Sequence, residues 1–124
     1  MDWIDSYLAA FNAHDADALA SFFASACTYT DVPHAMTWAG HDGIREMFAA
    51  TLAFHADCVM RRVNGFRDEH HYCVEWIAHG TVAGDSVSYR GISVGEFDDK
   101  GRIVEDRDYW NPKDIPILNR TPSV

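Results

Sequence analysis

The segment from Arg107 to Asn111 places a carboxyl group, Asp108, two residues before a large aromatic ring, Trp110. Side chains alternate between the two faces of a strand, so these two residues point the same way if the segment is a strand. Apolar surroundings raise the pKa of a carboxyl group toward neutrality, and a flat ring can hold a flat ligand. The pattern suits proton transfer in an apolar pocket. It equally suits a structural salt bridge of Asp108 at a strand end, beside a core tryptophan.

The composition limits the classes of protein that need to be considered. A chain of 124 residues with 48% hydrophobic and 13% aromatic residues is expected to form one folded domain, residues 1–124. The net charge of -9 and pI near 5.0 argue against nucleic acid or an anionic membrane as partner, since both attract clustered basic residues. No apolar stretch approaches the roughly 20 residues that cross a bilayer, and the N-terminus lacks a basic signal region. We expect a cytoplasmic protein.

Cysteines and histidines show no metal-binding pattern. The three cysteines lack C-x-x-C spacing, and the seven histidines lack H-x-H or H-E-x-x-H spacing. We therefore expect no metal and no cofactor, and activity that survives chelation. His79 ends a strand-like segment that also carries Trp76. It could protonate a leaving hydroxyl in a dehydration, or it could be an edge-strand histidine that meets solvent.

Three helices and a set of strands must position these groups. Helical spacing of Ile4, Leu8 and Phe11 predicts a helix over 2–13, Asp15 is a suitable N-cap for a second helix to about 24, and Asp42 for a third. A short strand is predicted at 27–31 and longer strands at about 57–66, 70–82, 86–97 and 102–111, with turns at 64–65, 83–85 and 98–101. This order predicts an α+β domain, in which a meander of antiparallel strands forms a curved sheet around helices packed on one face.

With these elements placed, the chain resembles the superfamily of ketosteroid isomerases, nuclear transport factor 2 and SnoaL-like polyketide cyclases. The resemblance extends over nearly the whole chain. It rests on the strings at residues 7–15, 29–33, 40–44, 97–103 and 107–110. It implies a cone-shaped, cystatin-like roll, in which a curved antiparallel sheet wraps around three N-terminal helices.

The resemblance also implies roles for individual residues. In ketosteroid isomerases a helix tyrosine, matched here by Tyr7, donates a hydrogen bond to the substrate oxygen, and an aspartate, matched by Asp31, shuttles the proton. The second donor of that family, a protonated aspartate, falls on Ser93, a weaker donor. Polyketide cyclases and limonene epoxide hydrolases carry their key acid at the position of Asp108. The epoxide hydrolases also need an Arg-x-Asp pair, which this chain lacks.

Each assignment has a structural alternative. Asp31 could instead accept backbone hydrogen bonds in the turn before Pro33, and Tyr7 could be a core tyrosine. If the turn near Lys100 follows the family register, Ser93 pairs with Asp108. One face of the sheet then carries Tyr89, Ser93, Asp106, Asp108 and Trp110, while Tyr29 shares a face with Asp31.

The sequence thus predicts a cofactor-independent enzyme that abstracts a proton beside the carbonyl of a small, largely apolar cyclic or aromatic ketone. Isomerisation, aldol cyclisation and dehydration all remain open, and either Asp31 or Asp108 is the base. Tyr7, with Ser93, would hold the enolate oxygen. Tyr29, Phe48, Trp76, His79 and Trp110 would contact the ligand. The alternative is a non-catalytic ligand-binding or dimerisation module. A two-fold homodimer is expected through the outer sheet face that carries Arg90, Ile92, Val94 and Tyr109.

Overall fold

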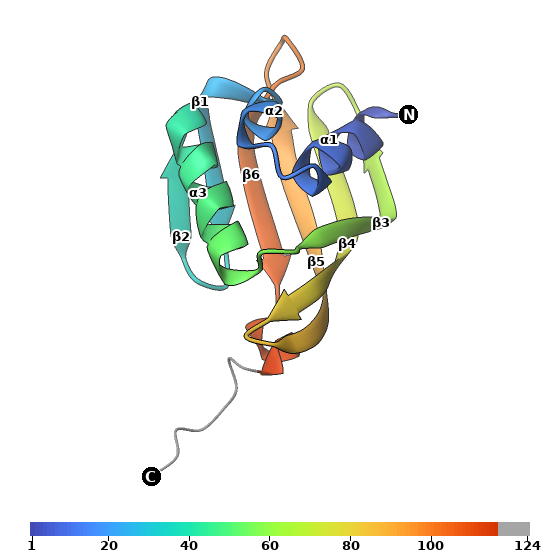
Figure 1. Ribbon diagram of the computed structural model, residues 1–124. Coiled ribbons are helices and arrows are strands. Elements are labelled where there is room, and N and C mark those ends of the chain that lie inside the picture. Colours follow the sequence, from blue (N-terminus) through green and yellow to red (C-terminus); the bar gives the residue numbers. More distant parts are fainter. Residues whose placement is uncertain (117–124) are drawn as a thin grey trace.

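The computed structural model describes residues 1–116. Within this range three helices lie on one side of a six-stranded sheet (Figure 1). The helices are α1 (Trp3–Asn12), α2 (Ala16–Ala20) and α3 (Gly40–Phe54). The strands are β1 (Phe23–Asp31), β2 (Met36–Ala39), β3 (Val59–Arg67), β4 (His71–Val82), β5 (Asp85–Phe97) and β6 (Ile103–Trp110), and a 3-10 turn, η1 (Pro112–Asp114), follows β6. The predicted α+β class is confirmed.

The helices begin where the sequence supplies caps, with two differences from the predicted bounds. The Asp15 carboxylate accepts hydrogen bonds from the backbone N–H groups of Asp17 and Ala18 and so caps α2. This helix ends at Ala20 rather than near 24, because the chain enters β1 at Phe23. Helix α3 begins at Gly40, so Asp42 lies in its first turn, near the positive end of the helix dipole, and does not cap it.

The sheet has the order β2-β1-β6-β5-β4-β3, and it is not a pure antiparallel meander. Strand β1 pairs in parallel with β6, while the other neighbouring pairs are antiparallel. The parallel register sets Asp31 beside Asp108. Two local predictions were also wrong. Residues 36–39, expected in a loop, form the edge strand β2. Asn64 and Gly65, expected in a turn, lie inside β3, directly after a register shift between Arg62 and Asn64.

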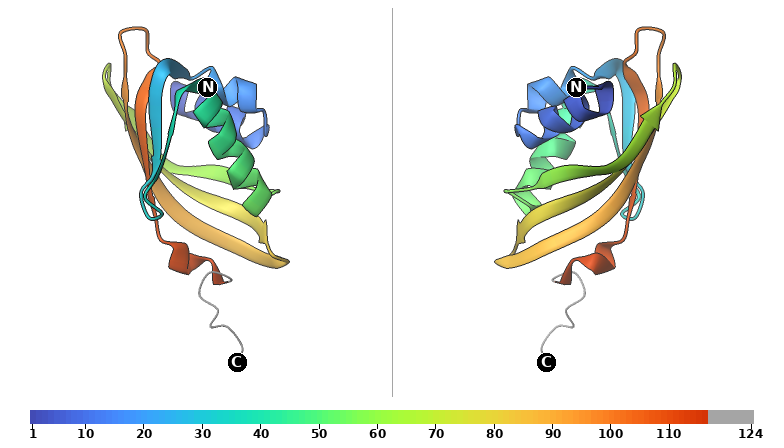
Figure 2. Two further views of the ribbon diagram at one scale, coloured as in Figure 1. Left: turned by 90° about the vertical axis from the view of Figure 1, so that its left-hand side faces the viewer. Right: turned by 90° about the vertical axis from the view of Figure 1, so that its right-hand side faces the viewer.

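The sheet curves around the helices, and the core fills the space between them (Figure 2). Two glycines in β5 allow aromatic rings from β4 to lie across that strand. A Cβ atom on Gly91 would lie 2.2 Å from the Trp76 ring, and one on Gly95 would lie 2.4 Å from the Tyr72 ring. The two rings therefore cross β5 toward the centre of the concave face, where the polar groups described next are buried.

Candidate active site

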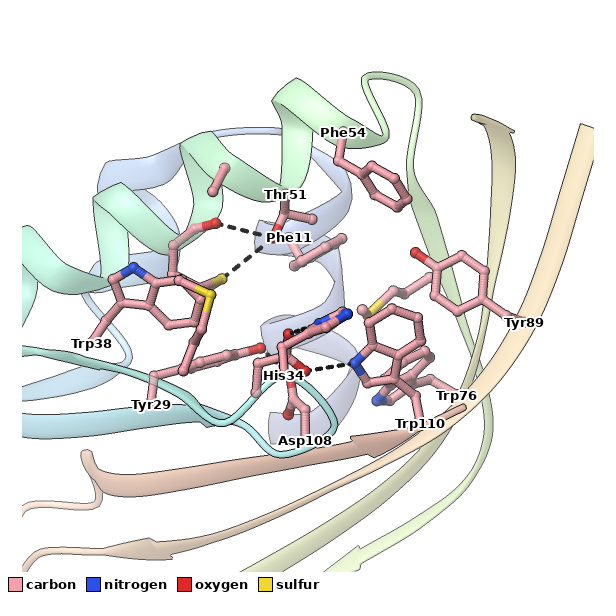
Figure 3. A pocket seen from close by; sticks show the side chains of 15 residues that line it. Phe11, Tyr29, His34, Trp38, Thr51, Phe54, Trp76, Tyr89, Asp108 and Trp110 are labelled. Atoms are coloured by element: carbon pink, nitrogen blue, oxygen red, sulfur yellow. Dashed lines mark hydrogen bonds and ion pairs between the residues drawn. The ribbon is translucent and has the colours of Figure 1, made fainter. Parts of the chain in front are cut away.

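A cavity of about 390 Å³ opens between α3, the turn after β1 and the concave face of β4, β5 and β6. Most of its wall is apolar, as in other small-molecule sites. The apolar side chains that enclose it include Phe11, Trp38, Met47, Trp76 and Trp110. The groups in the lining that can exchange protons or donate hydrogen bonds to a ligand include Tyr29, Asp31, His34 and Asp108. Figure 3 labels three of them, Tyr29, His34 and Asp108.

Asp108 lies at the bottom of this cavity with both carboxyl oxygens occupied. The Tyr29 hydroxyl donates to its Oδ2, and the Ser93 hydroxyl donates to its Oδ1 at 2.7 Å. The Trp76 indole N–H in turn donates to Ser93 Oγ at 2.9 Å, which orients the serine. The register predicted from the β5–β6 turn is confirmed, because Ser93 and Asp108 are direct partners.

The electrostatics of this cluster favour the protonated form of a carboxyl group. Burial raises the pKa of Asp108, although the neighbouring Asp106 carboxyl group and the hydrogen bonds from Tyr29 and Ser93 oppose that shift. Behind it, Asp106 is fully buried, and its pKa is raised well above the usual range by burial and by the neighbouring Asp108. Burial also raises the pKa of Tyr29 well above its usual value, so its hydroxyl keeps its proton and acts as a donor.

Asp31 stands at the mouth of the cavity, next to Asp108 in the sheet. Its Oδ1 accepts a hydrogen bond from the Trp110 indole N–H at 2.7 Å, and its Oδ2 lies 2.7 Å from His34 Nδ1. The side chain of Asp31 is 19% exposed and that of His34 is 44% exposed, so this pair connects the cavity to solvent. These side-chain partners replace the backbone hydrogen bonds that the structural alternative for Asp31 required.

Tyr7, Phe48 and His79 lie outside the cavity lining. Tyr7 stacks on Trp3 at 5.3 Å between ring centroids, in an aromatic cluster beneath α1, as in the core alternative. Phe48 is buried behind Phe11, with 5.0 Å between their centroids. His79 is an odd number of residues from Trp76 and so points to the opposite face of β4. The tyrosine that donates to Asp108 is therefore Tyr29.

The sequence predicted no role for His34, and it placed Tyr89 on the concave face without a function. His34 lies three residues after Asp31 in a turn, a spacing that lets two side chains meet, and this was the available signal. Tyr89 lines the cavity beside Trp110, with 5.4 Å between the ring centroids, and its hydroxyl is 3.0 Å from His55 Nδ1. Nothing in the local sequence pattern joins Tyr89 to a residue 34 positions earlier.

Residues 1–116 contain neither a metal-binding cluster nor a membrane-spanning helix. This part of the chain holds no group of three or more His, Cys, Asp or Glu residues arranged to bind a metal ion. None of its helices has the length and apolar character needed to span a bilayer. The three cysteines are free thiols, two of them buried.

Solved structures of other proteins share the fold of this chain. A protein from Catenulispora acidiphila with a ketosteroid isomerase-like fold, solved with trimethylamine, is 21% identical, with a TM-score of 0.85 over 96% of both chains. SalBIII, an epoxide hydrolase/cyclase-like enzyme with a role in pyran ring formation in the polyether salinomycin, is 19% identical, with a TM-score of 0.76 over 90% of this chain and 89% of SalBIII. A protein described as a SnoaL-like polyketide cyclase, from Shewanella denitrificans, is 13% identical, with a TM-score of 0.76 over 94% of this chain and 95% of its own.

These structural matches establish a shared fold, and the predicted resemblance is confirmed at that level. No curated protein sequence matched the chain. The family model for the SnoaL-like domain matches residues 4–106, which is most of the sequence. The chain therefore belongs to the SnoaL-like domain family.

Proposed function

We propose that this protein is a cofactor-independent acid–base enzyme that moves a proton next to the carbonyl of a small, largely apolar cyclic or aromatic ketone. The observation that carries the proposal is the pair Asp31 and Asp108. They are partners on adjacent strands and open into the same apolar cavity, but their environments differ. Two carboxyl groups in unlike environments are the usual basis for separate acid and base roles.

Asp108 is suited to act as the acid. It is 7% exposed, burial raises its pKa, and Tyr29 and Ser93 fix the position of its carboxyl group. In its protonated form it would donate a hydrogen bond to the ligand carbonyl and stabilise the negative charge that develops there. Such fixed donors in a water-poor site are commonly the largest contribution to a rate increase.

Asp31 is suited to act as the base. It is more exposed than Asp108, and its contact with His34 offers a path by which an abstracted proton can reach solvent. The Trp110 indole N–H holds its other oxygen in place. The resulting enolate is common to isomerisation, aldol cyclisation and dehydration. Two structural neighbours are described as cyclase-type proteins, which supports the ring-forming reaction among these.

The test uses 2-tetralone, a bicyclic aromatic ketone, as probe. Loss of its α-proton signal in deuterated buffer, followed by proton NMR, measures proton abstraction without knowledge of the natural substrate. We expect the parent protein to accelerate the exchange above the buffer rate. Asp31→Asn should lower that rate by about 10² to 10⁴, the range for a positioned base. The control is Asp42→Asn, the same chemical change at an exposed position on α3, which should leave the rate unchanged.

Two variants separate the roles of the acids. An asparagine at position 108 still offers an N–H donor, whereas a leucine offers none. If Asp108 is the acid, Asp108→Leu should lose much more activity than Asp108→Asn. Equal losses would contradict this assignment and make Asp108 the base. If the parent protein exchanges the probe no faster than buffer does, the enzyme proposal fails and a non-catalytic ligand-binding module takes its place.

A further inference from the structure

A further polar side chain of the cavity, Tyr89, lies at some distance from Asp108. Figure 3 shows its hydroxyl near Phe54, across the rings of Trp76 and Trp110 from the Asp108 carboxyl. The Tyr89 ring packs 5.4 Å from Trp110 and 6.2 Å from Trp76, measured between centroids. A ligand that reaches both ends of the cavity would meet Asp108 at one end and Tyr89 at the other.

The Tyr89 hydroxyl is hydrogen-bonded to a buried histidine. His55, at the C-terminal end of α3, is 0% exposed, and its Nδ1 lies 3.0 Å from the Tyr89 oxygen. Burial lowers the pKa of His55, so the ring is neutral at neutral pH and carries one proton. In a neutral ring one nitrogen donates and the other accepts. The position of that proton decides what Tyr89 can offer a ligand.

The surroundings of the other ring nitrogen fix the proton. His55 Nε2 lies 3.6 Å from Asp57 Oδ1, and it has no hydrogen-bond partner within the described residues. Asp57 is held there by the backbone N–H of Thr81, which donates to the same oxygen at 2.8 Å. The backbone of His79 is a further acceptor near the His55 imidazole. Because the groups around Nε2 are acceptors, the proton belongs on Nε2, and Nδ1 must accept the hydrogen bond from Tyr89.

The backbone packs closely around His55 and Asp57 and leaves no room for a side chain beside them. Gly80, with a φ of +148°, passes directly beside the pair. A Cβ atom at that position would lie 2.2 Å from His55 Nε2 and 2.6 Å from Asp57 Oδ1, so a side chain there would displace both. The buried Cys58 thiol also contacts the Tyr89 hydroxyl. Burial raises the pKa of Cys58 to about 11, so the thiol stays neutral and its sulfur is a weaker acceptor than an imidazole nitrogen.

We propose that Tyr89, oriented by His55 and Asp57, forms a subsite that accepts a hydrogen bond from a ligand hydroxyl. The Tyr89 hydroxyl donates its hydrogen bond to His55 Nδ1. Only the lone pairs of the Tyr89 oxygen then remain to contact a ligand in the cavity. The ligand of this protein is then a ketone with a hydroxyl at the end opposite its carbonyl. Of the proposed function, this inference uses only the binding of a ketone in the cavity.

The first test examines the parent protein without ligand. Nitrogen-15 NMR of the histidine rings should show His55 protonated on Nε2 and bare on Nδ1. Asp57→Asn removes the carboxylate at an exposed position, so it should move part of the population to the Nδ1-protonated form. A parent ring protonated on Nδ1 would overturn the proposal.

The second test compares the affinities of 6-hydroxy-1-tetralone and 6-methoxy-1-tetralone, which differ in the ability to donate. Tyr89→Phe should lower the ratio of hydroxy to methoxy affinity by about two- to tenfold, as expected for one hydrogen bond. Tyr109→Phe, the same change on the exposed face of β6, is the control and should keep the parent ratio. An unchanged ratio in Tyr89→Phe, or no binding of either ketone to the parent, would reject the subsite.

The two proposals can fail separately. The histidine NMR experiment reports on the free protein, and the affinity comparison reports on binding. Neither experiment requires turnover. Absence of α-proton exchange in 2-tetralone would refute the enzyme proposal and leave these results unaffected. A ratio of hydroxy to methoxy affinity that Tyr89→Phe leaves unchanged would refute the subsite and leave the exchange rate as evidence for the enzyme.

Discussion

Asp106 and Asp108 lie two residues apart on the same buried face of β6, yet only Asp108 lines the cavity. The Tyr72 hydroxyl donates to Asp106 Oδ1, while Asp106 Oδ2 has no hydrogen-bond partner in the part of the chain that the structure describes. A bare charge at a fully buried position would be very costly. Asp106 is therefore a neutral group that supports the site from behind.

The first prediction concerns pH and stability. The pKa of Asp106 is raised by burial, so above about pH 4 the unfolded chain releases a proton that the folded protein keeps. The free energy of unfolding then falls as pH rises toward the raised pKa, by up to about 1.4 kcal/mol per pH unit for one proton. Asp106→Asn removes this titration. In urea unfolding at several pH values, the variant should gain stability relative to the parent as pH rises. A difference that does not change with pH would contradict the buried neutral acid.

The second prediction concerns the coupling of Asp31 and Asp108. If one group takes a proton while the other stabilises the charge that forms, removal of either one disables the same step. The double variant Asp31→Asn/Asp108→Leu should therefore lose less 2-tetralone exchange than the product of the two single losses. Losses that multiply would show two groups that act independently.

The third prediction concerns assembly. The outer face of the sheet exposes Ile92 and Tyr109, which are partners on β5 and β6 and are 41% and 46% exposed. We predict a two-fold homodimer through this face, because an uncovered apolar sheet surface commonly marks an interface. Ile92→Glu should give a monomer in sedimentation velocity. Phe54→Glu, at an equally exposed apolar residue of α3 on the other side of the sheet, is the control. A monomeric parent protein at micromolar concentration would reject the dimer.

Local patterns predicted the elements well. Alternation placed Tyr29 and Asp31 on one face of β1, and the turn near Lys100 set Ser93 against Asp108. These features depend on neighbours in sequence or on one hairpin. The parallel pairing of β1 with β6 could not be derived in this way, because parallel strands far apart in sequence have no connecting turn to fix their register.

The candidate site was less predictable than the fold for a related reason. Helical periodicity shows that Tyr7 faces inward, but not which part of the sheet it meets, and that depends on how α1 packs. Tyr7 was predicted to hold the enolate oxygen, but in the structure it joins the aromatic cluster with Trp3 outside the cavity lining. The tyrosine that donates to Asp108 within the lining is Tyr29. The link between His55 and Tyr89 joins a helix end to a strand, a contact that neither element specifies alone.

The pairing of Asp31 with Asp108 also orders events during synthesis and folding. Strand β1 is made early, but its partner β6 is made after every other strand of the sheet. A nascent chain can therefore form the β3–β4–β5 hairpins while half of its candidate site is still missing. Contacts between such distant segments carry a high entropic cost, so docking of β6 on β1 is expected to be a late and slow step. A refolding chain should then begin to bind a ketone only in the last phase of refolding, after most secondary structure has formed.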